Sequence, residues 1–366
     1  MTFLTRYRDI LRALTDKRLG RAPLPGNAAA AVALPNYDRY VRVNLLETEG
    51  ETHARLRRLL STALSPRRVA NLKERVRQVA RELIERVPSG ADVDFIGEIA
   101  EPFPVTVISE LLGWPARERH RLRPWSADIV RLYEKDAGAD HARRAEAACA
   151  EFAAMLDSLA DERKLAPRDD FISALAALEN EPGGLSRDEL ISSCMLLLNA
   201  GHEATVNAAG NGLLGLLRHP GAMQRLRLDP SLLETSIEEM LRYDAPLHLF
   251  HRFACEEIVV GGVVIPKGGK VGLLYGSANR DPTVFPEPDV FDVARNPNRH
   301  LAFGAATHFC LGAPLARLEL RTLIATLLAK TTQIELCGGE PEYRPGLVFR
   351  GLKSLRISWD RTSATC

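Results

Sequence analysis

The chain has 366 residues, and its 48 lysines and arginines nearly balance its 47 aspartates and glutamates, which gives a formal charge of +1 at pH 7. Because nucleic acids and anionic membranes attract an excess of basic residues, this balance argues against either as the main partner. With 46% hydrophobic and 26% charged residues, the composition is that of an ordinary globular protein that can bury a large core.

The sequence also lacks the segments that would place a protein in or across a membrane. Its longest apolar runs fall far short of the ~18 residues that a membrane-spanning helix needs. Its first residues lack the apolar core and the small-residue cleavage site of a secretory signal. Six cysteines are scattered without a CxxC pair, so structural disulfides are not expected. We therefore expect a cytoplasmic protein that binds neither nucleic acid nor membranes.

Helical periodicity dominates the first two thirds of the chain. Apolar positions recur at helical spacing over residues 7–17, and a loop rich in proline and glycine follows through about Asn36. The same spacing predicts a succession of helices at residues 55–64, 66–86, 96–112, 116–133, 139–160, 169–179, 186–218, 221–229 and 232–243.

Strands are expected mainly in the last third. Residues 258–265 and 270–276 flank the turn Pro-Lys-Gly-Gly and are predicted to pair with each other. The four prolines of residues 282–298 predict an extended meander. Residues 311–330 form a strongly apolar helix in this prediction, and residues 352–359 a closing strand. The fold class predicted from these patterns is mainly α, an α+β domain with small β-sheets.

One segment combines a cysteine with surroundings that favour its ionisation. Cys310 lies between a glycine-containing loop that begins at Phe303 and the start of a long helix, where backbone N–H groups and the helix dipole favour a thiolate. A thiolate there can bind a soft metal, although a buried cysteine on its own is more often an inert core residue. Zinc is disfavoured, because no second cysteine lies nearby to complete a tetrahedral set.

The residues around Cys310 resemble the haem-binding signature of the cytochrome P-450 family, the haem-thiolate monooxygenases. The residues that carry this resemblance are Phe303, Gly304, His308, Cys310, Gly312, Leu315, Ala316 and Arg317. The resemblance implies the triangular, helix-rich fold of that family, a bound haem b, and Cys310 as the axial ligand of its iron. The chain departs from the family at Ala306, where glycine is usual and a positive φ would be strained.

Glu239 and Arg242 form an E-x-x-R pair on one predicted helix face. By itself the pair indicates an ordinary solvated salt bridge. The family has such a pair at this distance before the cysteine, locked to an arginine of the following meander, and Arg295 resembles that third partner. The resemblance therefore implies a structural role for the three residues.

His53 and Arg57 are one helical turn apart and can face one anion together. Without further information they indicate only a basic surface helix. In the family an H-x-x-x-R helix at this place binds a haem propionate. The same resemblance implies that Arg252 and His308 supply the remaining propionate contacts.

A glutamate and a glycine lie inside one long apolar helix, where each is costly. Asn199, Glu203 and Asn207 share a face of that helix, which can hold waters leading to a buried site, and the alternative is a hydrogen-bonded core glutamate. The stretch from Gly201 to Thr205 resembles the A-G-x-[D/E]-T segment that crosses the haem over the oxygen site in the family. Glu203 is then the acid that delivers protons.

Ala204 stands where the family usually has a threonine that shares in proton delivery. Thr205 comes one position later, about 100° around the helix, so we expect that it does not simply substitute. Some family members that oxidise polyketide macrolides share this alanine, and in them a substrate hydroxyl and waters take over the relay. Gly201, Glu203, Ala204 and Thr205 are thus the candidate catalytic segment.

The resemblance runs from about Phe3 to Trp359, and it implies that residues 1–366 form a single haem-thiolate domain. The family usually has several tens more residues before such a start, so we expect a shortened N-terminal cap region. The implied activity is insertion of one oxygen atom of O2 into a hydrophobic natural product, terpenoid or steroid-like molecule. The second oxygen atom leaves as water.

No G-x-G-x-x-G flavin fingerprint appears, so electrons are expected from a separate ferredoxin and ferredoxin reductase. These proteins would dock near the face that carries the cysteine. Arg58, Arg67 and Arg68 are candidate contacts for them.

Substrate contacts are expected from residues 24–46, 197–204, 247–250 and 347–349, most of which are apolar. The individual residues proposed for this role are Leu197, Ala200, Leu247, Leu249 and Val348. Two alternatives remain open. One is a haem-thiolate enzyme that uses peroxide directly or couples phenols oxidatively, and the other is a haem-binding protein without catalytic activity.

Overall fold

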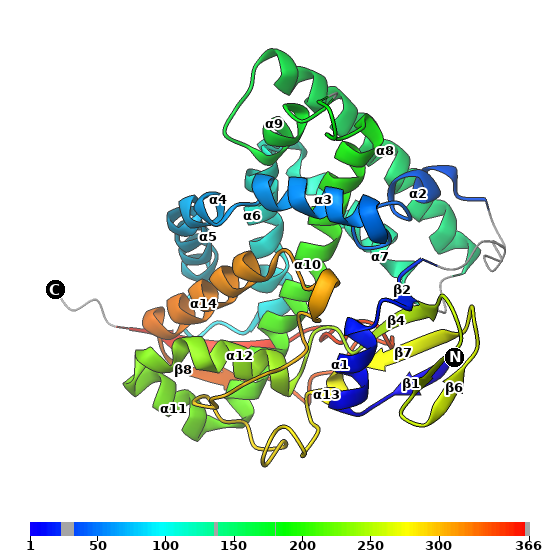
Figure 1. Cartoon of the computed structure of the whole chain (residues 1–366). Coiled ribbons are helices and arrows are strands. Elements are labelled where there is room, and N and C mark those ends of the chain that lie inside the picture. The colour runs from blue at the N-terminus through cyan, green and yellow to red at the C-terminus, as the bar shows by residue number, and fades with distance from the viewer. Residues whose placement is uncertain (23–32, 135–137, 180, 363–366) are drawn as a thin grey trace.

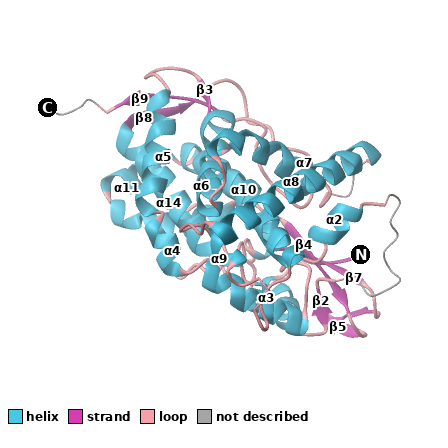
Figure 2. Cartoon of the chain, turned by 90° about the horizontal axis from the view of Figure 1, so that it is seen from above, coloured by secondary structure: helices cyan, strands magenta, loops and turns pink. Residues whose placement is uncertain are grey.

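Helices form most of the molecule, and the strands gather at two of its edges (Figures 1 and 2). The computed structural model describes residues 1–22, 33–134, 138–179 and 181–362. The α-helices of this part are α1 (Tyr7–Thr15), α2 (Pro35–Tyr40), α3 (Gly50–Ala63), α4 (Pro66–Asn71), α5 (Lys73–Arg86), α6 (Pro102–Leu112), α7 (Leu122–Arg131), α8 (Ala139–Leu165), α9 (Phe171–Ala176), α10 (Arg187–Arg218), α11 (Pro220–Leu228), α12 (Leu233–Tyr243), α13 (Tyr275–Ala278) and α14 (Ala313–Lys330). Shorter turns are the π-helix η1 (Ile96–Ala100) and the 3-10 helices η2 (Ala116–Arg121), η3 (Pro230–Leu232) and η4 (Ala306–His308).

The long helix α10 runs through the middle of the molecule (Figure 1). Its 32 residues span about 48 Å, and a capping box between Ser186 and Glu189 starts it. The helices α6, α7, α8, α12 and α14 pack around it, so most of its side chains are buried. A Cβ at Gly201 would lie only 2.8 Å from Cδ1 of Ile108, so glycine lets the Ile108 side chain of α6 pack directly against α10. This crossing brings the Glu203 segment into the centre of the fold.

In the part of the chain that the structure describes, nine strands form three small sheets. The strands are β1 (Thr2–Leu4), β2 (Leu19–Gly20), β3 (Val93–Asp94), β4 (Leu249–Ala254), β5 (Ile258–Val260), β6 (Val263–Ile265), β7 (Lys270–Leu274), β8 (Thr331–Leu336) and β9 (Arg356–Arg361). The first sheet has the order β1-β7-β4-β2, in which only the β1–β7 pair is parallel. The second has the order β3-β9-β8, and the third is the β5–β6 hairpin. A separate small core fills the space between the first sheet and α1.

The predicted pairing of residues 258–265 with 270–276 is wrong. Gly261 and Gly262 both have positive φ, 60° and 82°, which is the backbone of a tight hairpin turn, so the first segment folds back on itself as β5 and β6. The second segment, β7, instead pairs with β4 on one side and with β1 on the other. Strands β1, β2, β3, β4 and β8 were not expected, because they are short or lie next to helical patterns.

Several predicted helices have different boundaries. The helix expected over residues 66–86 is two helices, α4 and α5, which meet at Leu72. The helix expected over 96–112 begins as the π-helix η1 and continues as α6 from Pro102, whose ring cannot occupy a helix interior. Residues 282–298 contain no helix or strand, as expected of a meander. The closing strand β9 begins four residues later than predicted.

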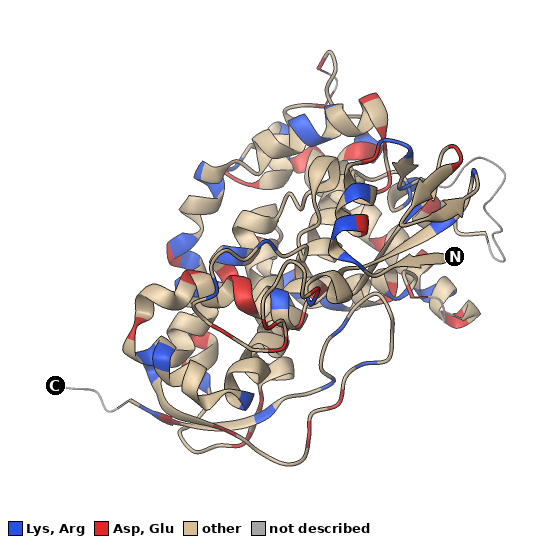
Figure 3. Cartoon of the chain, turned by 60° about the horizontal axis from the view of Figure 1, so that its bottom comes forward, with Lys and Arg blue, Asp and Glu red and all other residues tan. Residues whose placement is uncertain are grey.

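Acidic and basic side chains are interspersed over the molecule (Figure 3). This distribution agrees with the near-neutral charge of the sequence. Within the described residues, no helix is both long and apolar enough to cross a membrane.

Candidate active site

A tight loop presents Cys310 just before α14. The N–H of Gly304 donates to the Leu301 carbonyl at 2.9 Å, and the N–H of Cys310 donates to the Phe303 carbonyl at 2.9 Å. Gly304 and Ala306 have φ of 68° and 56°, so both occupy the left-handed region. Because α14 begins at Ala313, the sulfur lies beside the first N–H groups of that helix.

Two opposing influences act on the Cys310 thiol. Burial raises its pKa, whereas the N–H groups of Gly312 and Ala313 and the guanidinium groups of Arg57 and Arg317 favour the thiolate. No cluster of three or more His, Cys, Asp or Glu side chains that could hold a metal ion occurs in the described part of the chain. Cys310 can therefore serve a metal only as a single ligand, with the other ligands supplied by a cofactor.

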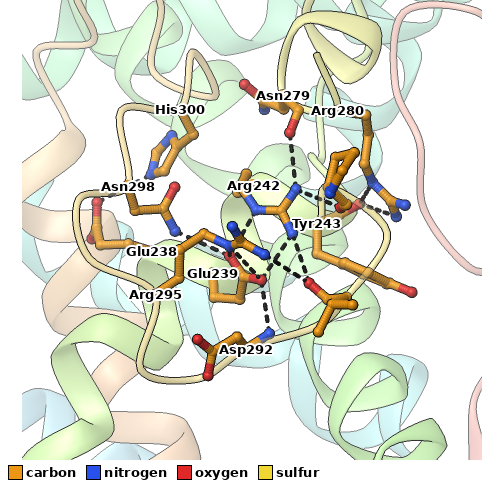
Figure 4. A network of polar contacts seen from close by, with 12 residues as sticks. Glu238, Glu239, Arg242, Tyr243, Asn279, Arg280, Asp292, Arg295, Asn298 and His300 are labelled. Carbon is orange, nitrogen blue, oxygen red and sulfur yellow. Dashed lines mark hydrogen bonds and ion pairs between the residues drawn. The ribbon is translucent and has the colours of Figure 1, made fainter. Parts of the chain in front are cut away.

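A buried polar network joins α12 to the meander that precedes the Cys310 loop (Figure 4). Glu239 and Arg242 are both 0% exposed and form a bidentate ion pair at 2.7 and 2.8 Å. Arg295 of the meander donates to Glu239 at 3.2 Å, so the structure brings together the three residues that the sequence analysis grouped. Arg242 also donates to the Asn279 carbonyl at 2.9 Å, and the Asn279 side chain accepts from the N–H of Leu301 at 2.7 Å. The network thus connects α12 to the first residue of the loop.

A cavity of about 860 Å3 extends from Cys310 to α10. The loop side of its wall includes Phe303, Gly304 and Gly312, and the α10 side includes Gly201, Ala204 and Thr205. All five proposed substrate residues, Leu197, Ala200, Leu247, Leu249 and Val348, also line it. Of the predicted segment 24–46, residues 24–32 lie outside the described part, and Leu34, Tyr37, Val41, Leu45 and Leu46 line the cavity. The cavity wall is mostly apolar.

One end of this cavity gathers groups that attract anions. His53 is 1% exposed, its ring centroid lies 4.3 Å from that of His308, and its Nε2 atom has no hydrogen-bond partner. Burial, with help from His308 and Arg57, lowers the pKa of His53 to about 4. Arg252 is 2% exposed and donates to the His251 carbonyl at 3.0 Å. Neither Arg57 nor Arg252 has a carboxylate within ion-pair distance among the described residues. Because a buried cation needs a counter-ion, this end fits the carboxylates of a ligand.

Glu203 does not line the cavity, because its carboxylate is held on the outer side of α10. It forms an ion pair with Arg344 at 3.0 Å, and Arg344 also pairs with Glu101 at 2.8 Å. Arg123 then pairs with the other oxygen of Glu101, and its side chain is 56% exposed. Burial raises the pKa of Glu203, and Arg344 opposes this shift. The four side chains form a continuous charged path from α10 to the surface.

Several charged residues of the site were missed by the sequence analysis. Arg21 lines the cavity, and Glu49 accepts from the His308 ring at 3.0 Å. The Glu134 carboxylate accepts from the N–H groups of Leu347, Val348 and Phe349, so it fastens the segment after α7 to a turn beside the cavity. These residues, like Arg344, lie far along the chain from their partners, so no local spacing identifies them.

Comparisons with known proteins agree with this geometry. The model of the family described as cytochrome P-450 matches residues 135–341. The 6-deoxyerythronolide B hydroxylase of Saccharopolyspora erythraea is 36% identical, over 98% of this chain and 90% of that protein. The vitamin D(3) 25-hydroxylase of Pseudonocardia autotrophica is 38% identical, over 99% of this chain and 88% of that protein. The crystal structure of P-450 BioI in complex with an acyl carrier protein ligated to hexadec-9Z-enoic acid has a TM-score of 0.91 at 34% identity, and covers 97% of this chain and 91% of that one.

The chain belongs to the cytochrome P-450 family. It is therefore a P-450 monooxygenase with haem b as its cofactor, and the family, the fold class and the cofactor expected from the sequence are confirmed. The residues present fit this cofactor. The thiol of Cys310 faces a cavity whose polar end holds two guanidinium groups without carboxylate partners and an imidazole nitrogen without any partner among the described residues.

Glu239→Gln is expected to destabilise the protein by about 3–5 kcal/mol, because it leaves the buried Arg242 and Arg295 without a full counter-charge. Urea denaturation followed by circular dichroism measures this change. Glu234→Gln is the matched control on the same helix, since Glu234 is 76% exposed and pairs with Arg321 at the surface, and less than about 0.5 kcal/mol is expected there. Equal effects of the two substitutions would contradict the supporting role of the network.

Ala306→Gly is expected to stabilise the protein by about 1 kcal/mol, because glycine adopts a φ of 56° without the strain that a Cβ imposes. Ala305→Gly is the control next to it. Ala305 has a φ of −152°, so glycine there adds only flexibility to the unfolded chain and should destabilise slightly. The same denaturation assay compares the two, and a loss of stability in Ala306→Gly would show that the left-handed backbone is not strained.

Proposed function

We propose that this P-450 monooxygenase oxidises a hydrophobic or amphipathic natural product, with electrons from a ferredoxin and a ferredoxin reductase. The observation that carries the proposal is the largely apolar cavity of about 860 Å3 between Cys310 and α10, which is large enough for a substrate above a bound haem. The names of similar proteins point to the same class of substrate. They include a vitamin D(3) 25-hydroxylase, a 6-deoxyerythronolide B hydroxylase and a polyketide biosynthesis cytochrome P-450 of Bacillus subtilis.

The haem in this proposal lies between the Cys310 loop and α10. Cys310 would supply the thiolate that binds its iron, and the loop residues Phe303, Gly304 and Gly312 shape the wall beside it. His53, Arg57, Arg252 and His308 would hold the two propionates, which would supply the counter-charge that the half-buried Arg57 and the buried Arg252 lack among the described residues. When bound, the haem supplies the activation of O2 and the transfer of one oxygen atom, while the second oxygen atom leaves as water.

Glu203 is proposed to hold and release protons for the reaction. Its partners Arg344, Glu101 and Arg123 connect it to the surface, and the raised pKa caused by its burial keeps a proton on it more readily. Buried polar atoms without partners continue along α10, and each requires a hydrogen-bond partner such as water. These atoms are Oδ1 of Asn199, both ring nitrogens of His202 and Nδ2 of Asn207.

Ala204 supplies no hydroxyl to the cavity wall, and Thr205, which also lines it, lies about 100° further around α10, so the proton path is left incomplete at Ala204. We propose that a hydroxyl of the substrate and bound waters complete it. The same observation favours a second candidate, a haem-thiolate enzyme that uses peroxide directly, because peroxide already carries the protons and electrons that O2 requires.

Electron transfer is proposed to occur through the face beside α3 and α4. Arg58 and Arg67 are exposed there and available to an acidic partner. Arg68 is less available, because it donates to the Ala63 carbonyl at 2.6 Å and pairs with Asp169 at 3.4 Å.

The first test is the absorption spectrum of the dithionite-reduced protein under carbon monoxide. The wild type should show the strongly red-shifted Soret band of thiolate ligation, and Cys310→Ser should lose it because a hydroxyl oxygen is a much weaker electron donor. Cys337→Ser is the control, since Cys337 is also partly exposed but lies outside the cavity. A red-shifted band in Cys310→Ser would reject the assignment of the ligand.

Glu203→Gln should lower turnover supported by O2, ferredoxin and reductase by about 100-fold, the usual contribution of a positioned acid. Glu98→Gln on the exposed side of the adjacent η1 is the control and should leave turnover unchanged. Product formation and peroxide release are measured together. High turnover with added peroxide alone, at the same rate in the wild type and in Glu203→Gln, would favour the second candidate. Tight binding of a small molecule without product under every electron supply would show a protein without catalytic activity.

A further inference from the structure

A third guanidinium group, that of Arg21, lies at the anion-attracting end of the cavity. Arg21 follows β2 directly and is 3% exposed. Its guanidinium carbon lies 4.3 Å from the centroid of the Phe250 ring, and its side chain pairs with Glu47. Its Nε atom is buried without a hydrogen-bond partner. The long, charged side chain of Arg21 is thus buried while one of its N–H donors lacks a hydrogen-bond partner.

Two shared acceptors join Arg21 to the residues proposed to hold the propionates. The His251 carbonyl accepts from Arg21 and from Arg252, each at 3.0 Å, so two buried guanidinium groups converge on one oxygen atom. Likewise, Oε1 of Glu49 accepts from the backbone N–H of Arg21 at 2.6 Å and from the ring of His308 at 3.0 Å. Arg21 is therefore adjacent to both Arg252 and His308.

The charges at this end of the cavity favour an anion from outside the chain. Two like charges that converge in a buried place repel each other, and a neutral carbonyl oxygen does not compensate for this repulsion. Glu47 pairs with Arg21, and the nearby Glu49 carboxylate is engaged by the N–H of Arg21 and the His308 ring, so Arg252 has no ion-pair partner among the described residues. A carboxylate placed between them would accept hydrogen bonds from both and would engage the unpartnered Nε of Arg21.

We propose that Arg21 is a further haem-binding residue, which donates to the propionate that Arg252 holds. The inference rests on the proposed function, because it takes Arg57, Arg252, His53 and His308 as the propionate contacts. The ligand chemistry is that of a carboxylate, and haem is its source because both shared acceptors connect Arg21 to propionate contacts. A carboxylate of the substrate is the other source that the same chemistry allows, and it is an outcome of the test.

The experiment measures the transfer of haem from the holoenzyme to excess apomyoglobin. Arg21→Gln should release haem about tenfold faster than the wild type, the usual effect of losing a charge-assisted hydrogen bond. Arg18→Gln is the matched control, because Arg18 is on the same segment but is 43% exposed and pairs with Asp16. It should release haem at the wild-type rate. Arg252→Gln is the positive reference.

Three outcomes of this assay decide between the inference and the proposed function. Faster loss in Arg21→Gln and Arg252→Gln, but not in Arg18→Gln, supports the inference. Faster loss in Arg252→Gln alone overturns the inference and leaves the proposed propionate contacts intact. Wild-type rates in all variants overturn both.

Two further measurements distinguish haem binding by Arg21 from a purely structural role of its ion pair with Glu47. Glu47→Gln removes the carboxylate that pairs with Arg21 but keeps Arg21 itself, so it should release haem within about twofold of the wild-type rate. A rate of haem release equal to that of Arg21→Gln overturns the inference. The propionate bending band in the resonance Raman spectrum should shift in Arg21→Gln and stay unchanged in Arg18→Gln. Faster haem loss without that shift also overturns it.

The source of the carboxylate is tested by titrating the holoenzyme with dodecanoic acid and with dodecanol, followed by the spin-state change in absorbance. Arg21→Gln should leave the ratio of the two affinities unchanged. A selective loss of affinity for dodecanoic acid with wild-type haem release would assign Arg21 to the substrate and overturn the inference.

Discussion

The buried ion pair between Glu239 and Arg242 is the interaction on which the position of Cys310 depends. A charge taken out of water is stable only when its lone pairs and protons are satisfied, so the pair recruits Arg295 and several backbone groups of the meander. Through the Asn279 carbonyl and side chain, this organisation reaches Leu301 and thus the start of the Cys310 loop. The meander has no regular secondary structure, and the ion pair replaces the missing hydrogen-bond ladder as the means of ordering it.

The need to satisfy buried charges has the opposite consequence at the end of the cavity where His53 and Arg252 lie. There the chain buries Arg252 without a carboxylate and leaves Nε2 of His53 without a partner. Buried polar groups without partners lower the stability of the ligand-free protein, and they raise its affinity for a ligand that supplies the missing partners. The Glu239–Arg242 ion pair has its charges balanced within the chain, whereas Arg252 in the cavity does not, and this contrast distinguishes support from binding within one molecule.

Glu203 shows how α10 serves both packing and chemistry. The helix must be apolar to pass through the core, and Gly201 lets it approach α6 closely. Glu203 is tolerated in this setting because Arg344, which is shared with Glu101, compensates its charge on the outer side of the helix. The carboxylate is thus connected to solvent through side chains rather than through the cavity, which leaves the inner face of α10 to Ala204 and Thr205.

The sequence alone determined the features that depend on short spacing along the chain. The i, i+3 spacing of Glu239 and Arg242, the i, i+4 spacing of His53 and Arg57, and the loop-to-helix position of Cys310 each place side chains together once a helix is assumed. Only the tertiary structure decided the contacts between distant segments, such as Arg21 with His251 and Glu203 with Arg344. Strand pairing belongs to the same group, because Gly261 and Gly262 make a hairpin of one predicted strand and leave β7 to β1 and β4. Local periodicity fixes the face on which a residue lies, whereas the partner on that face is chosen by packing over the whole chain.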